Sequence, residues 1–220
     1  VPLPDRTGTL MFMIGITFQW HHSKSYLFKV CLVDVPCDPK PGYLTIVCGS
    51  EKKIIKALGK LVFKMTPDLV MGFNDCDYDW PWLIKRAKNY PGVLEFLAEC
   101  FDRTIPYRSY EDNKVFSYNF KHEKVKLEAD AYAEGYTLTF PGYINLDVRT
   151  LFRQLYPTAE KSSLNWFLGK NKLIGKNDMP YQEMFRIYRL LKAKVVQMEY
   201  IESLVTLWYK FDSLDKLYPE

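Results

Sequence analysis

The sequence lacks the cysteine and histidine patterns that form disulfide frameworks or structural zinc sites. Its 5 cysteines are odd in number and contain no C-x-x-C pair, and only 3 histidines occur. His21 and His22 are adjacent, so on a strand they would point to opposite faces and would not share a metal. Neither a disulfide framework nor a structural zinc is therefore indicated, and a reducing compartment fits best.

Long apolar runs and a strong net charge are also missing. No apolar run approaches the ~18 residues of a membrane span, and the N-terminus shows no charged-then-apolar signal pattern. The net charge of +4 is mild, so it permits a polyanionic partner without requiring one. We expect no membrane association and a location in the nucleus or the cytoplasm.

Aromatic residues are abundant: the chain contains 16 Tyr, 14 Phe and 5 Trp in 220 residues. Such rings fill cores or stack on nucleic-acid bases, and composition alone does not choose between these uses. A hydrophobic content of 48% is sufficient for a sizeable core.

The first half of the chain has the pattern of three strands followed by helix, strand and helix. Ser50 has the character of a helix N-cap, and Pro67 forbids continuation of the helix that it starts. The expected strands are Thr9–Trp20, Ser25–Val35, Tyr43–Cys48 and Leu69–Phe73, and the second helix is expected over Trp80–Tyr90.

The second half is less regular. Residues 101–140 are charged and aromatic, which favours a strand-bearing insertion with alternation in Lys114–Tyr118 and Thr137–Phe140. A strand is expected over Gly142–Val148, a helix around Arg149–Tyr156, a helical turn capped by Ser162 or Ser163, and further helix over Tyr181–Lys210. The pattern predicts one α/β domain over residues 1–220 with C-terminal helices in 181–212.

Four polar residues follow the Leu69–Phe73 strand directly: Asn74, Asp75, Asp77 and Asp79. The carboxyl end of a strand is where α/β sheets usually place ligand chemistry, and oxygen ligands suit Mg²⁺ or Mn²⁺. The alternative is a helix N-terminus whose aspartates cap it and complement its dipole. Spacing alone favours that alternative.

A longer match reverses this preference. Asn74-x-x-x-Tyr78-Asp79, with Trp-Pro-Trp-Leu-Ile-Lys-Arg-Ala after it, resembles the second exonuclease motif of family B DNA polymerases, Asn-x-x-x-(Phe/Tyr)-Asp. Further segments resemble the family in the same order: Met13–Phe18, Cys48–Glu51, Gly142–Val148, Ser163–Asn165 and Asp178–Pro180. The likeness therefore covers nearly the whole chain.

The resemblance implies a ribonuclease-H-like mixed sheet with flanking helices and a two-metal site for Mg²⁺ or Mn²⁺. It implies that Asp79 is a catalytic and metal-binding carboxylate, and that Asn74 and Tyr78 bind the substrate, a single-stranded DNA 3′ end. The remaining polymerase domains would be partners, and a viral replication site joins the expected locations. Asp75 and Asp77 match no family carboxylate, so we interpret them as solvated loop acids or helix-start residues, with contact of Asp77 to a metal-bound water as an alternative.

The chain departs from the family at the first and third motifs. The first, an Asp-x-Glu on the central strand, is not found, so we expect a domain that is incomplete at the N-terminus and inactive alone, with strand edges left to pair with the missing strand. The third should be Tyr-x-x-x-Asp, but Val195–Leu204 contains no Asp. Glu199 could replace it as a catalytic residue and Glu202 lies one turn along; a solvated helix face is the alternative for both.

Two further features have two interpretations each. Asp147, at the end of a predicted strand, could support the cleft or could cap the next helix. An aromatic and basic group could stack on single-stranded DNA or pack onto the domain; its members are Tyr107, Arg108, Tyr110, Lys114, Phe116, Tyr118, Phe120 and Lys121.

The sequence predicts a 3′–5′ proofreading exonuclease domain of a family B DNA polymerase, which hydrolyses the 3′-terminal phosphodiester with divalent metal ions. The alternative is a catalytically degenerate domain of the same fold that binds DNA and serves as a scaffold of the polymerase. Asp79 favours the first function and the missing third-motif Asp favours the second.

Overall fold

A computed structural model describes residues 10–102, 120–128, 131–138, 140–177 and 179–215. The chain divides into two compact units. One comprises Val1–Met11 and Glu51–Asn177, and the other comprises Phe12–Ser50 and Asp178–Glu220. The first is called the catalytic-motif unit below because it contains Asn74, Tyr78 and Asp79, and the second is called the hairpin unit.

The hairpin unit contains a three-stranded sheet in the order β1-β2-β3. Strands β1 (Met13–Phe18) and β2 (Phe28–Val33) pair antiparallel as a hairpin, and β3 (Tyr43–Val47) pairs parallel to β2. Among the described residues β1 has β2 as its one neighbour in this sheet, so its other edge has no described partner strand. The alternating apolar residues of the sequence thus form the three strands that were predicted.

A single long helix, α6 (Tyr181–Asp215), completes the hairpin unit. Its first turns pack on the start of the sheet: the ring of Tyr188 stacks on Phe12 with centroids 4.5 Å apart. The buried carboxylate of Asp34 accepts hydrogen bonds from Tyr188 Oη at 2.5 Å and Lys192 Nζ at 3.1 Å. One continuous helix therefore occupies the segment for which C-terminal helices were predicted.

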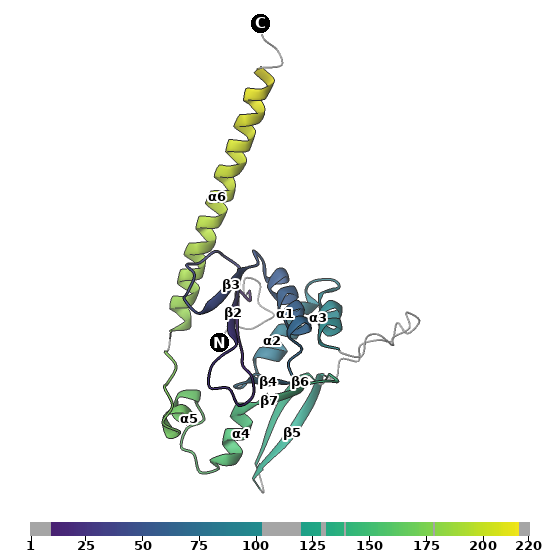
Figure 1. The fold of residues 1–220 in the computed structure, drawn as a ribbon, viewed down its shortest axis with the longest axis vertical. Helices are drawn as coiled ribbons and strands as arrows, with labels where there is room; N and C mark the ends of the chain where they lie inside the picture. The colour runs from purple at the N-terminus through teal and green to yellow at the C-terminus, as the bar shows by residue number, and fades with distance from the viewer. Residues whose placement is uncertain (1–9, 103–119, 129–130, 139, 178, 216–220) are drawn as a thin grey trace, which may run out of the picture. The chain divides into compact units, whose positions relative to one another are not determined.

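The catalytic-motif unit begins with α1 (Glu51–Met65), β4 (Leu69–Gly72) and α2 (Asp79–Lys88), in agreement with the predicted order. A third helix, α3 (Val93–Phe101), follows and lies beside α1 (Figure 1). A Cβ placed on Gly59 of α1 would lie 3.2 Å from Cys100 of α3, so the glycine allows these helices to approach closely. Helix α3 was not anticipated from the sequence.

A buried ion pair joins α1 to α2. Glu51 is 4% exposed, and its carboxylate accepts hydrogen bonds from Arg86 Nε at 2.8 Å and Arg86 Nη2 at 2.5 Å. Tyr90 Oη at 2.6 Å and the backbone N–H of Met11 at 2.7 Å also donate to it. The negative charge of Glu51 is therefore fully compensated.

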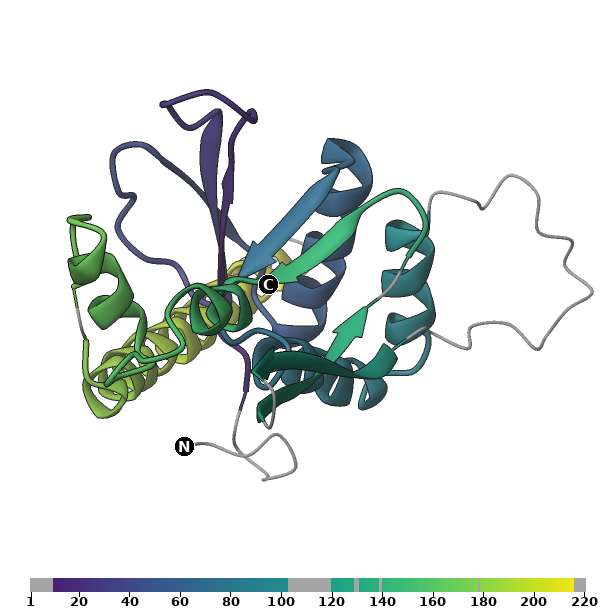
Figure 2. The same ribbon diagram turned by 90° about the horizontal axis from the view of Figure 1, so that it is seen from below.

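Strand β7 (Ile144–Asp147) pairs parallel to β4, and the two lie side by side in Figure 2. Helix α4 (Val148–Leu155) follows β7 directly. Helix α5 (Leu164–Lys170) starts at Ser163, whose side chain accepts a hydrogen bond from the backbone N–H of Trp166. Of the two serines proposed as caps, the structure selects Ser163.

The predicted insertion contains a two-stranded hairpin of β5 (Phe120–Glu128) and β6 (Ala131–Leu138), seen as a long pair of strands in Figure 1. The strand proposed in Lys114–Tyr118 lies outside the described residues. So do the proposed base-stacking residues Tyr107, Tyr110, Phe116 and Tyr118, and the side chain of Phe120.

The described elements form a mixed α/β structure, which confirms the α/β part of the predicted fold class. Its strands occur in three small sheets, ordered β1-β2-β3, β4-β7 and β5-β6. Over the part of the chain that the structure describes, no helix has both the length and the apolar character needed to cross a membrane.

Candidate metal and exonuclease site

The candidate site lies at the carboxyl ends of β4 and β7. These strands are parallel, and Gly72 at the end of β4 is in register with Asp147 at the end of β7. The polar loop after β4 and the start of α4 after β7 therefore begin at the same edge of the sheet. This register brings together residues about 70 positions apart in sequence, as with Asn74 and Asp147 at a separation of 73.

Asn74 makes the turn that leads out of β4. Its φ of 64° lies in the left-handed region, which asparagine tolerates better than most side chains. The backbone N–H of Asn74 donates to Asp147 Oδ1 at 2.9 Å, and Arg149 Nη1 donates to Asn74 Oδ1 at 2.6 Å. The predicted substrate-binding asparagine is thus fixed between β7 and α4.

Of the two roles considered for Asp147, the structure shows the helix cap, and support of the cleft stays a prediction. Asp147 is the N-cap of α4, because its Oδ1 accepts a hydrogen bond from the backbone N–H of Arg149 at 2.8 Å. The same oxygen holds the Asn74 turn. Asp147 therefore caps a helix and also stands among the acidic side chains that follow β4.

Asp75 is buried, which corrects its interpretation as a solvated loop acid. It is 6% exposed, and its Oδ2 accepts a hydrogen bond from Trp80 Nε1 at 3.0 Å. A Cβ on Gly72 would lie 2.5 Å from the Asp75 carboxyl group, so only glycine leaves room for this side chain to fold back against the strand. The second carboxyl oxygen, Oδ1, is buried with no hydrogen-bond partner.

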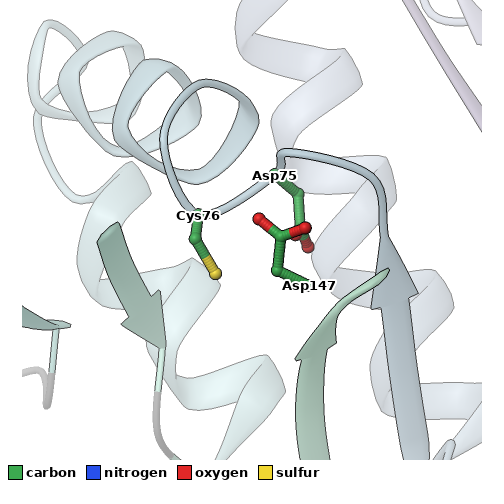
Figure 3. Close-up of side chains that lie close together, drawn as sticks. All are labelled: Asp75, Cys76 and Asp147. Atoms are coloured by element: carbon green, nitrogen blue, oxygen red, sulfur yellow. The ribbon is translucent and has the colours of Figure 1, made fainter. Parts of the chain in front are cut away.

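Asp75, Cys76 and Asp147 form a compact group of three potential metal ligands (Figure 3). One ligand atom from each residue lies within 4.8 Å of the others. Cys76 is 9% exposed, and β6 passes close to it: a Cβ on Gly135 would lie 2.8 Å from the Cys76 Cβ. The three side chains thus converge in an interior position.

Desolvation, and after it the negative charge of Asp147, raises the pKa of each aspartate that follows β4. Burial, with the nearby charge of Asp147, raises the pKa of Asp75 to about 6. Desolvation and then Asp147 also raise the pKa of Asp79. For Asp77 desolvation raises the pKa, although Arg149 acts in the opposite direction. This clustering of carboxylates fits a divalent cation, which would offset their repulsion.

Asp79 and Tyr78 lie where α2 begins. Asp79 is the first residue of the helix, and the residue is exposed although desolvation raises the pKa of its carboxyl group. Tyr78 is 39% exposed, and its ring centroid lies 5.7 Å from that of Trp82. Their roles in metal and DNA binding stay predictions.

Asp77 differs from Asp75 because it faces solvent. Its side chain is 48% exposed and lies 3.7 Å from Arg149 Nη1. The interpretation of Asp77 as a solvated loop acid is confirmed, whereas its contact with a metal-bound water stays a prediction. An ion pair this open to water adds little stability.

Glu199 and Glu202 are both exposed on α6, which belongs to the hairpin unit. Their exposure agrees with the alternative interpretation, in which both glutamates lie on a solvated helix face. The catalytic role of Glu199 stays a prediction.

Sequence reasoning missed Cys76 as a potential ligand, and it did not select Asp147. The search for cysteine ligands relied on C-x-x-C and histidine spacing, which a mixed Asp-Cys-Asp group does not have. A usable signal existed for Asp147: polar residues at the ends of two predicted strands meet whenever those strands are parallel neighbours.

Comparisons with known proteins show which family this chain resembles. The exonuclease domain of DNA polymerase family B matches residues 4–158. A "DNA polymerase beta" of African swine fever virus (isolate Pig/Portugal/Lis 60/1960) is 35% identical over 189 residues, which are 86% of this chain and 15% of that polymerase.

A DNA polymerase of Pyramimonas orientalis virus is 31% identical over 98 residues, 44% of this chain and 8% of that protein. A DNA polymerase of Archaeoglobus fulgidus is 42% identical over 45 residues, 20% of this chain and 6% of that protein. The chain thus spans a small part of the curated relatives that it matches.

Proposed function

We propose that this chain, which belongs to the exonuclease domain family of family B DNA polymerases, supplies the 3′–5′ proofreading activity of a larger polymerase. The proposed reaction is hydrolysis of the 3′-terminal phosphodiester of single-stranded DNA. The observation that carries the proposal is the convergence of Asp75, Asp79 and Asp147 at the carboxyl ends of β4 and β7. The relatives' printed names, all DNA polymerases, support it.

The proposed fold is the ribonuclease-H-like sheet of this family, with residues 1–220 as one domain. In that arrangement β1 and β4 would each pair with a strand carrying an Asp-x-Glu motif. In the part of the chain that the structure describes, β1 and β4 each have one free edge within their own sheet, which supports this.

The proposed cofactor is Mg²⁺ or Mn²⁺, held in part by Asp79. Hard cations of this kind favour carboxylate oxygens, and desolvation followed by the nearby charge of Asp147 raises the pKa of Asp79. Bound metal supplies an activated water and stabilises the attacking and leaving oxygens. Glu199 is the proposed replacement for the third-motif aspartate.

The proposed substrate contacts come from the loop and helix around Asp79. Tyr78 presents an exposed ring on which a terminal base could stack. Asn74, fixed by Arg149 and Asp147, would hold the 3′ end of the DNA next to the metal. The single-stranded 3′ end and the remaining polymerase domains are the proposed partners.

The test is divalent-metal-dependent degradation of a single strand labelled at its 5′ end. It compares this chain, the chain extended by a strand carrying Asp-x-Glu, and Asp79→Ala in the extended form. Asp38→Ala is the matched control, because Asp38 is an exposed carboxylate in the hairpin unit.

We expect the extended form to cleave, Asp38→Ala to cleave equally well, and Asp79→Ala to lose cleavage while it remains folded. The proposal is overturned if the folded, metal-loaded extended form never shortens the strand. It is also overturned if Asp79→Ala cleaves as fast as the parent.

A further inference from the structure

The three side chains of Figure 3 differ from an ordinary acidic cluster because one of them is a thiol. Asp75 and Asp147 each offer a carboxylate oxygen and Cys76 offers its sulfur, all within 4.8 Å of one another. Asp75 and Cys76 are 6% and 9% exposed. Asp147 is half-buried, so the group needs compensation of its negative charge when all three side chains are deprotonated.

The Asp75 carboxylate is an independent sign of a missing ligand. Its Oδ1 is buried and has no hydrogen-bond partner among the described residues, although Oδ2 accepts a hydrogen bond from Trp80 Nε1. A buried polar atom without a partner is costly in a folded protein. Figure 3 shows this carboxylate directed toward Asp147, so an ion between the two would satisfy the oxygen.

The backbone around the group holds all three side chains in place. Gly72 lets Asp75 fold back against β4, and Gly135 lets β6 pass over Cys76. Asp147 Oδ1 is fixed by two backbone N–H groups, those of Asn74 and Arg149. The ligands are thus positioned before any ion binds, which lowers the cost of binding.

We propose that Asp75, Cys76 and Asp147 form a binding site for one borderline-soft divalent cation of the zinc class, with Cys76 as a thiolate ligand. Thiolate sulfur favours such ions over Mg²⁺, which prefers oxygen ligands. On binding, the Cys76 thiol loses its proton to solvent and a sulfur–metal bond forms, with no change of oxidation state. Three protein ligands leave one position of a tetrahedral ion to water.

This site shares Asp75 and Asp147 with the carboxylate cluster of the proposed function, and it adds Cys76, which that function does not use. Desolvation and the nearby charge of Asp147 raise the pKa of Asp79, but Asp79 is not one of the three ligands. An ion held through Cys76 would place a second positive charge next to Asp79. Binding of zinc and cleavage of DNA are therefore measured separately.

The test is calorimetric titration of the full 220-residue chain with Zn²⁺ and with Mg²⁺ in a phosphine-reduced buffer. We expect one zinc site, weakened on the order of 100-fold by Cys76→Ser, whereas Mg²⁺ affinity changes less than about threefold. Cys100→Ser is the matched control, since Cys100 is a partly buried thiol on α3. His21→Gln with His22→Gln controls for the adjacent histidine pair.

Cobalt provides a direct readout on the unaltered chain. Co²⁺ bound by a thiolate gives a sulfur-to-metal charge-transfer absorption, which we expect in the parent and in Cys100→Ser but not in Cys76→Ser. Cys76→Asp should remove the absorption and favour Mg²⁺ instead. If Cys76→Ser fails to fold, Cys76→Asp and the parent absorption decide the outcome.

The inference is overturned if Zn²⁺ affinity is unchanged in Cys76→Ser, if no charge-transfer absorption occurs in the parent, or if the histidine variants alone abolish zinc binding. These results concern the Cys76 sulfur, which the proposed magnesium-dependent cleavage does not use. Conversely, a chain that never cleaves DNA could still show the cobalt absorption, so the two proposals fail separately.

Discussion

Two places in the catalytic-motif unit bury a carboxylate to nearly the same extent, and their surroundings are opposite. Glu51 is 4% exposed and accepts four hydrogen bonds, two of them from Arg86. Asp75 is 6% exposed, has one oxygen without a partner and faces the further negative charge of Asp147. A buried acid that is fully paired holds a fold together, whereas one that is not paired is suited to a cation.

Loss of the paired carboxylate should have the largest effect. Glu51→Gln leaves the Arg86 guanidinium buried without a counter-charge, so we expect a loss of about 3–5 kcal/mol in the free energy of unfolding. Urea denaturation followed by circular dichroism measures this. A loss below about 1 kcal/mol would show that the pair is not structural.

Neutralisation of the unpaired carboxylate should act in the opposite direction. Asp75 has a pKa of about 6 in the folded protein against 3.8 as an ordinary group, so its ionisation at pH 7 opposes folding by about 3 kcal/mol. Asp75→Asn should therefore raise the metal-free unfolding free energy, and should weaken stabilisation by divalent cations. Equal destabilisation by Asp75→Asn and Glu51→Gln would remove the distinction between the two places.

Gly72 allows a test of the space that the buried Asp75 side chain needs. Gly72→Ala would put a Cβ 2.5 Å from the Asp75 carboxyl group, and we expect a cost of about 1–3 kcal/mol as that side chain is displaced. Gly169→Ala on α5 is the matched control, because nothing lies within 4 Å of its added Cβ. Thermal unfolding of both variants tests this, and equal melting temperatures would contradict it.

Acidification should produce the smallest effect. A carboxyl group whose pKa is raised on folding favours the folded state below its unfolded pKa, and this contribution is lost as the pH rises through the folded pKa. For Asp75 the window runs from about 3.8 to about 6. Between pH 7 and pH 5 we expect the metal-free parent to gain about 1 kcal/mol relative to Asp75→Asn. A constant difference across this range would contradict the raised pKa.

Local chemistry made much of the fold predictable from sequence. Helix α1 begins at Glu51 and ends at Met65, next to Ser50 and shortly before Pro67, as the sequence predicts. Ser163 caps α5, as it was proposed to do. The match around Asn74 and Asp79 located the loop between β4 and α2 directly. These features depend on neighbours in sequence, which a pattern search can read.

The features that could not be predicted depend on contacts distant in sequence. The burial of Asp75 follows from its fold-back over Gly72 and from Trp80, and its charged neighbour Asp147 is brought in by the pairing of β4 with β7. Cys76 becomes a potential ligand because β6 covers it at Gly135. The spacing of residues in the sequence does not predict how those strands pair or in which register.

The central claim is that the carboxylates at the ends of β4 and β7 bind a divalent cation and that Asp79 is one of its ligands. Its most direct test is the unfolding free energy of the chain with and without Mn²⁺, in the parent, Asp79→Asn and Asp147→Asn. A site filled at 100 times its dissociation constant should stabilise the parent by about 2.7 kcal/mol, and each variant should lose most of this gain. Equal stabilisation of all three proteins by Mn²⁺ would contradict the claim.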